Sequence, residues 1–76
     1  MTKTSKLQGK MRECGFTLET LAKVVGLSPT GLFNKVHNKV EFLVSEVQTI
    51  GETLNLNDQE IQEIFFTKDV ELKSTR

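Results

Sequence analysis

Apolar residues recur at intervals of three and four along most of this 76-residue chain, the spacing that places side chains on one face of an α-helix. The first such stretch begins near Ser5 and carries Leu7, Met11 and Cys14 on one side. Gly15 then closes it. Because Cys14 falls on the apolar stripe, we expect it to be a small buried side chain and not a nucleophile or metal ligand.

The chain next predicts two short helices joined by a tight turn. Thr17 and Ser28 each have a hydroxyl that can cap a helix start, so helices are expected over residues 18–24 and 29–36. Between them, Gly26 is free to adopt the positive φ that ends a helix and redirects the chain. Two capped helices around a glycine turn, at this spacing, form the helix-turn-helix pattern.

A fourth helix is expected to begin with Ser45 as its cap and to end at Asn55. Its apolar face carries Val47, Ile50 and Leu54. The short segment before it, over residues 40–44, is expected to be extended or a turn.

The last expected helix opens at Asn57, whose side chain forms a capping box with that of Glu60. It carries four large apolar residues: Ile61, Ile64, Phe65 and Phe66. Either all four pack inward, or Phe65 and Phe66 contribute to a weak homodimer contact. With this element the chain predicts an all-α fold of five helices.

Length and composition favour one small domain over residues 1–76, since 37% of the residues are hydrophobic and only one is proline. We expect a core region over residues 5–66, a loose leader over residues 1–5 and a flexible tail over residues 67–76. The residues expected to be buried in the core include Leu21, Leu32, Val47, Ile50 and Ile61. A single cysteine and the lack of a long apolar run favour a cytoplasmic protein without a membrane span.

The net charge is zero, but it is divided along the sequence. Residues 1–39 hold seven basic and two acidic residues, a net +5, and residues 40–76 hold three basic and eight acidic ones, a net −5. This division favours a basic face for an anionic partner; the alternative is that both halves are simply solvated surface. The acidic residues between Glu41 and Glu60 are expected to face solvent. We find no catalytic pair, metal-ligand spacing or phosphate loop, so no enzyme, cofactor or metal is expected.

Phe33 lies one position round the third expected helix from Leu32, which belongs to its apolar face. It either wraps onto the edge of the core or projects from the exposed face. If exposed, it would contact a base methyl group or another protein.

A resemblance to the small Cro/CI-type regulators of temperate phages rests on KLQGKMRECG, FTLETLAKVVGLSPTGLFNKVHNK and EFLVSEVQTIGETLNLNDQEIQEIFF. These regulators form the lambda-repressor-like, or XRE, helix-turn-helix family. The chain is similar to the Cro-like and modulator-of-repression proteins of phages from Gram-positive bacteria, over roughly residues 5–66. The resemblance implies a five-helix lambda-repressor-like domain and a role in the switch between lysis and lysogeny.

In that family, the second helix of the pair enters the major groove of operator DNA. The resemblance implies that the bases are read by Pro29, Thr30, Phe33 and Asn34. It places near phosphates Thr17, Ser28, Lys35 and Lys39. Asn34 would pair with adenine, Thr30 would contact a base, and the lysines would add salt-dependent affinity.

This chain departs from the family at positions that bear on DNA binding. Leu18 stands where many relatives have a glutamine that braces a phosphate, and neither Pro29 nor Gly31 has a side chain that reads a base edge. The net charge of zero is also less basic than expected of a DNA binder. A second hypothesis therefore stays open: an antirepressor or modulator of repression that binds the phage CI-type repressor through the face around Phe33.

Overall fold

The computed structural model describes residues 1–66, and every regular element in that range is an α-helix. The helices are α1 (Thr4–Glu13), α2 (Leu18–Val25), α3 (Pro29–Val36), α4 (Val44–Thr53) and α5 (Asp58–Phe65). The expected all-α fold of five helices is thus confirmed for this part of the chain. The expected tail over residues 67–76 lies outside the described residues. Within residues 1–66, no helix combines the length and apolarity needed to cross a membrane.

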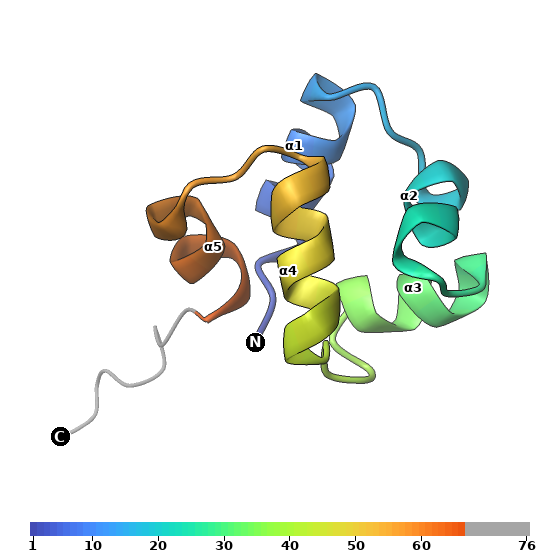
Figure 1. Cartoon of the computed structure of the whole chain (residues 1–76). Coiled ribbons are helices and arrows are strands. Elements are labelled where there is room, and N and C mark those ends of the chain that lie inside the picture. The colour runs from blue at the N-terminus through green and yellow to red at the C-terminus, as the bar shows by residue number, and fades with distance from the viewer. Residues whose placement is uncertain (67–76) are drawn as a thin grey trace, which may run out of the picture.

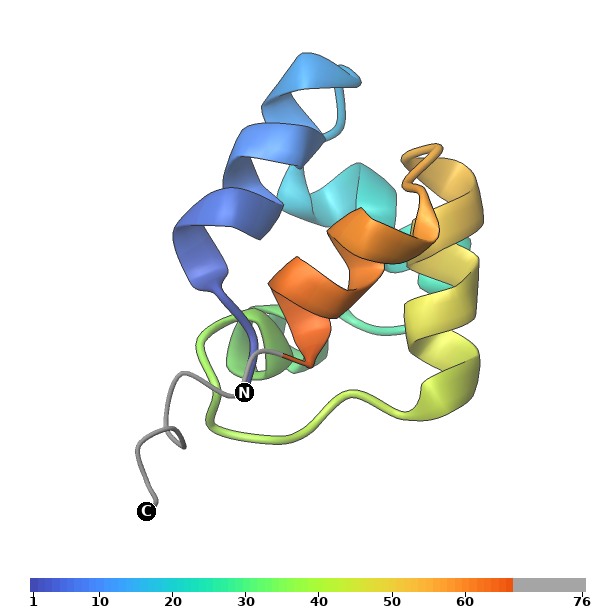
Figure 2. The same ribbon diagram turned by 90° about the vertical axis from the view of Figure 1, so that its left-hand side faces the viewer.

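Helix α4 lies between α5 and the α2–α3 pair, and α1 crosses behind its upper end (Figure 1). Figure 2 shows α5 between α1 and α4, both of which it contacts. The helices enclose one core, whose largest fully buried side chains are Leu7, Leu21, Leu32, Val36, Ile50 and Ile64. Of the residues expected in the core, Ile61 alone is only half-buried, at the core's edge.

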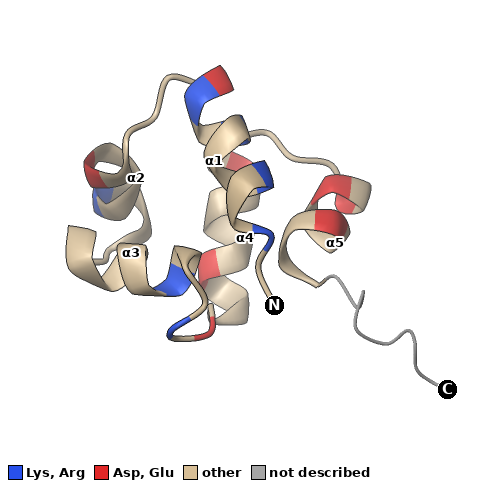
Figure 3. Ribbon diagram, turned by 180° about the vertical axis from the view of Figure 1, so that it is seen from behind, with Lys and Arg blue, Asp and Glu red and all other residues tan. Residues whose placement is uncertain are grey.

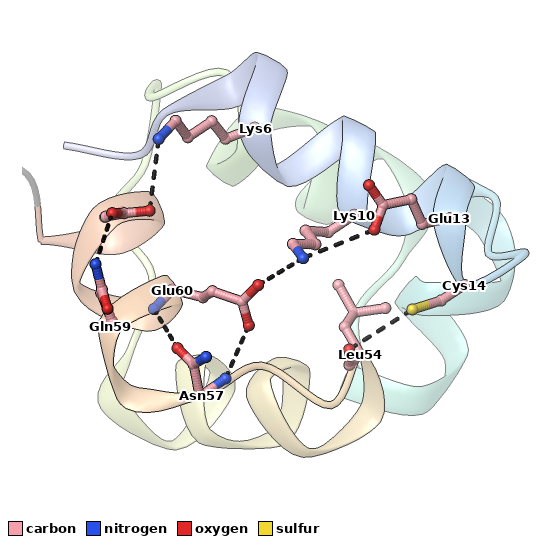
Figure 4. Close-up of polar contacts among 9 residues, drawn as sticks. Lys6, Lys10, Glu13, Cys14, Leu54, Asn57, Gln59 and Glu60 are labelled. Carbon is pink, nitrogen blue, oxygen red and sulfur yellow. Dashed lines mark hydrogen bonds and ion pairs between the residues drawn. The ribbon is translucent and has the colours of Figure 1, made fainter.

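Local capping signals define most helix ends. The Thr17 hydroxyl accepts the Thr20 N–H at 3.1 Å, and the Ser28 hydroxyl accepts the Gly31 N–H at 3.0 Å. Between these two helices, Gly26 has a φ of 86°, in the left-handed region that ends α2. The capping box of Asn57 and Glu60 is also present (Figure 4).

The expected start of α4 is wrong. The helix begins at Val44 and has Leu43, not Ser45, as its N-cap residue. The Leu43 N–H donates to the Glu46 carboxylate at 2.9 Å, so the cap comes from an acidic side chain three residues later. The Ser45 position lies inside the first turn, where its carbonyl accepts the Thr49 hydroxyl.

Cys14 was expected to be buried, and this is also wrong, because its side chain is exposed. Helix α1 ends at Glu13, so Cys14 follows the last helical residue and leaves the apolar stripe. Its thiol donates to the Leu54 carbonyl at a sulfur–oxygen distance of 3.6 Å (Figure 4).

The residues expected to form a loose leader are held in place by hydrogen bonds. Helix α1 already starts at Thr4, and Thr2 is buried. The backbone N–H of Thr2 donates to the Asn38 side chain, and that of Lys3 donates to the Ile64 carbonyl. The sequence showed no sign of this because both partners lie far along the chain.

The two phenylalanines considered for a dimer contact differ in exposure. Phe65 is buried, and its ring meets that of Phe42 edge-on with centroids 5.3 Å apart. Phe66 is 44% exposed. Of this pair, only Phe66 is therefore available to another molecule.

Candidate functional site

The residues selected from the sequence gather on and around the exposed side of α3. Pro29 and Thr30, in its first turn, are exposed, and Asn34 in the next turn is half-buried. Thr17 and Ser28 are exposed at the starts of α2 and α3, but both hydroxyls already serve as helix caps. The two hydroxyl oxygens thus stabilise the starts of α2 and α3 by capping them, whether or not a partner is bound.

Phe33 lies on the exposed face and not at the core's edge. Its side chain is 41% exposed, and its ring stacks on His37 with centroids 4.2 Å apart and the planes tilted by 38°. The two residues are four positions apart, so both rings lie on the same side of α3.

A groove of about 440 Å³ runs between this pair of rings and α1. Its floor includes the buried Met11 and Val36, and its α1 wall carries Gln8 and Arg12. A groove with an apolar floor and a basic rim therefore lies beside this side of α3. The sequence pattern did not predict this groove.

Lys35 does not reach the surface where a phosphate contact was expected. Its ammonium group lies 2.6 Å from the Glu46 carboxylate, and the two side chains are only 13% and 10% exposed. Figure 3 shows this contact as a basic segment of α3 against an acidic segment of α4. The pair joins the end of the candidate surface to α4.

Glu46 was expected to face solvent, and it is buried. Burial by itself raises the pKa of Glu46, because it disfavours the charged carboxylate. The hydrogen bonds from Lys35 and from the Leu43 N–H, together with the Lys35 charge, outweigh this effect and leave the pKa below its usual value. Glu46 thus stays ionised while it caps α4 and neutralises Lys35.

Folding also brings two lysines of α1 into ion pairs with acidic side chains. Lys6 pairs with Glu63 at 3.5 Å, and Lys10 pairs with both Glu60 and Glu13 (Figure 4). The hydrogen bond between Lys10 and Glu60 raises the pKa of Lys10 and lowers that of Glu60. Three of the seven basic residues of the first half, Lys6, Lys10 and Lys35, are therefore paired with acidic residues of the second half, which reduces the expected basic face.

Three basic side chains make no ion pair within residues 1–66: Arg12, Lys23 and Lys39. All three border α3. Lys23 lines a depression together with Pro29, Arg12 lines the groove together with Phe33, and Lys39 follows the helix. What remains of the basic face is thus three separate cations near one helix.

Besides the residues that the family resemblance implied, this surface includes Lys23, together with Arg12 and His37, which the sequence had indicated only as side chains available to phosphates. The spacing of His37 four positions after Phe33 is a signal that could have found it. Arg12 and Lys23 lie outside the α2–α3 turn and the exposed side of α3, so only the packing of α1 and α2 brings them beside the helix.

The chain belongs to the DUF739 family, described as proteins of unknown function, which it matches over residues 2–68. No curated protein and no solved structure matches it.

Proposed function

We propose that this protein is a phage transcription regulator of the lysis–lysogeny switch that binds operator DNA in a Cro-like manner. Helices α2 and α3 would form its helix-turn-helix, with α3 in the major groove. The observation that carries this proposal is that three cations without an ion pair in residues 1–66, Arg12, Lys23 and Lys39, lie near a helix whose outer side is exposed.

The exposed side of α3 has the groups that such a helix needs. An α-helix fits the major groove of B-DNA, where hydroxyl and amide side chains bond to base edges. Thr30 and Asn34 supply one group of each kind. The three cations would contact phosphates on either side, which accounts for affinity without sequence preference.

Binding to duplex DNA that flanks the gene, measured by fluorescence anisotropy over a range of salt concentrations, tests this proposal. Three phosphate contacts predict a slope of about −3 for the logarithm of the association constant against that of salt concentration. Lys39→Gln should weaken binding to every sequence and make the slope shallower by about 1. Lys6→Gln, which changes the same charge in the ion pair with Glu63, is the control and should leave the slope unchanged. Lack of binding at low salt would count against DNA as the partner.

A second candidate function is binding of the phage CI-type repressor protein by the same face. The exposed Phe33 ring beside an apolar-floored groove favours it, because aromatic anchors next to pockets carry much of the affinity at protein interfaces. The internal pairing of Lys35 points the same way, since it removes one expected phosphate contact.

The two candidates are separated by mixing the protein with operator DNA in the presence and absence of purified repressor. A Cro-like protein shifts the DNA alone at nanomolar concentration. An antirepressor releases the repressor from DNA, and a co-repressor shifts the DNA only when the repressor is present. Either of the last two results would favour the repressor protein as the main partner.

Operator half-sites are normally bound by pairs of subunits, so a weak homodimer belongs to the DNA-binding proposal. With Phe65 buried, Phe66 is the residue of the original pair that remains for such a contact. Light scattering at high concentration measures it: we expect partial dimerisation that Phe66→Ser abolishes. A strict monomer at these concentrations would contradict this part of the proposal.

A further inference from the structure

The three residues Thr2, Lys3 and Thr4 hydrogen-bond to parts of the chain more than 30 positions away. Thr2 donates its N–H to the side-chain oxygen of Asn38 at 2.8 Å and accepts from the Asn38 side-chain nitrogen at 2.9 Å. The Asn38 amide thus satisfies both backbone groups of one buried residue, as a neighbouring strand would.

The next two residues extend this contact. The Lys3 N–H donates to the Ile64 carbonyl in α5 at 2.7 Å, and the Thr4 hydroxyl donates to the Val36 carbonyl in α3 at 2.7 Å. Four hydrogen bonds therefore join this segment to the last turn of α3, to Asn38 two positions after the end of that helix, and to α5. We refer to residues 2–4 as the N-terminal strap.

Asn38 lies where α3 gives way to the turn that carries Lys39. Its φ of 65° is left-handed, and the N–H groups of Lys39 and Val40 fold back onto the Asn34 carbonyl at 2.8 and 3.3 Å. The backbone therefore closes the turn on α3, and the Asn38 side chain ties the turn to the strap, which reaches α5 through the Lys3 N–H.

The end of α4 provides an internal comparison. Asn55 also has a left-handed φ, of 56°, just after a helix. Within residues 1–66, however, the Asn55 side chain makes no hydrogen bond. The backbone geometry alone thus accounts for Asn55, whereas the amide of Asn38 has an additional partner 36 positions away.

We propose that Asn38 is a positioning residue for the partner-binding surface: through its two hydrogen bonds to Thr2, it fixes the turn that presents Lys39 beside α3. This inference rests on the proposed DNA-binding function. A turn that is held in place before binding loses less conformational freedom when Lys39 contacts a phosphate, so the strap raises affinity without touching the partner.

The test compares Asn38→Gly with Asn55→Gly. Glycine accepts the left-handed φ at both sites and costs similar chain entropy, so the pair differs mainly in the lost bridge to Thr2. Binding to the flanking duplex DNA is measured at a temperature where thermal melts show both variants folded. We expect about two- to tenfold weaker binding for Asn38→Gly and little change for Asn55→Gly.

Amide hydrogen exchange provides a measurement that does not depend on DNA. In Asn38→Gly, the amides of Lys39 and Val40 should exchange faster than in the parent, while core amides keep their protection. Asn38→Asp retains the acceptor for the Thr2 N–H and loses the donor, so it should give an intermediate rate.

Each combination of results decides the matter. If the parent binds DNA and the two glycine variants bind equally well, the positioning role is overturned. If the parent does not bind DNA, the proposed function fails, and exchange decides the positioning role alone. Faster exchange at Lys39 and Val40 then supports it, and unchanged exchange overturns it.

Discussion

Charged side chains are paired where α1 packs against α5, whereas three cations beside α3, Arg12, Lys23 and Lys39, make no ion pair within residues 1–66. On the first side, Lys6 and Lys10 meet Glu63 and Glu60 (Figure 4). Beside α3, within the described residues, Arg12 keeps its charge free and Phe33 exposes an aromatic ring. Ion pairing and burial both remove side chains from contact with a partner. The surface beside α3, where Arg12 is unpaired within this part of the chain and Phe33 is exposed, is therefore the better candidate for recognition.

The difference also explains how a chain of zero net charge can have a cationic edge. Three acidic residues of the second half, Glu46, Glu60 and Glu63, neutralise lysines of the first half. What is left near α3, within residues 1–66, is three unpaired cations and not a broad basic face. The predictions below test this contrast, from the largest expected effect to the smallest.

We expect the largest difference in stability between a substitution on the buried face of α3 and one on its exposed face. Leu32 is fully buried, so Leu32→Ala should lower the free energy of unfolding by about 2–5 kcal/mol. Phe33→Ala, one position away on the exposed face, should lower it by less than about 1 kcal/mol. Chemical denaturation of both variants measures this difference. Equal losses would mean that Phe33 belongs to the core and not to a binding surface.

The next effect concerns the ion pairs. Glu46→Gln should destabilise the protein by about 2–3 kcal/mol, because it leaves the nearly buried Lys35 charge without a counter-ion and weakens the α4 cap. Glu63→Gln, in the solvent-exposed pair with Lys6, should change stability little. Thermal melts compare the two. A Glu46→Gln variant as stable as the parent would contradict the structural role assigned to this pair.

Partner binding should depend on different residues of α3 for the two candidate functions. If DNA is the partner, Asn34→Ala should lose about 1–3 kcal/mol of discrimination at one base pair, and Phe33→Ala should have a small effect. If the repressor protein is the partner, Phe33→Ala should cost about 2 kcal/mol, with weak salt dependence. Binding titrations of both variants against both partners decide between the two patterns.

The smallest effect is a dependence on acid pH. Burial disfavours ionised Glu46, but its hydrogen bonds and the Lys35 charge lower its pKa overall, and the hydrogen bond from Lys10 lowers that of Glu60. A carboxyl with a lowered folded-state pKa adds stability above its unfolded-state pKa and loses it as pH falls through the folded value. Stability should therefore decline below about pH 4.5, the usual value for glutamate.

This decline should be shallower in a Glu46→Gln/Glu60→Gln variant, which has no carboxyl to protonate at either site. Unfolding free energies measured from pH 6 down to pH 3 test the prediction. An acid limb as steep as that of the parent would show that other carboxyls govern the decline.

Most helix boundaries could be predicted because their causes are local. The hydroxyls of Thr17 and Ser28 act on N–H groups three residues later, and Gly26 needs only its own backbone freedom. The start of α4 was the exception. Glu46 had been regarded as a surface residue, and its role as the cap depends on burial beside Lys35 from another helix.

The candidate site could be predicted only in part, for a related reason. The positions on α3 follow from the resemblance to Cro/CI-type regulators, which implied Thr30 and Asn34 as contacts to bases. Periodicity left Phe33 undecided and could not show that Lys35 is paired internally, because both outcomes depend on neighbours from other helices.

The sequence by itself determined the five helices, the turn at Gly26 and nearly all of the core, since these depend on the spacing of side chains within a few residues. Only the tertiary structure decided which charges cancel, which aromatic ring stays exposed and how residues 2–4 are tied to Asn38. Those outcomes require groups far apart in the chain to meet, and a linear pattern carries no information about which distant residues will be neighbours.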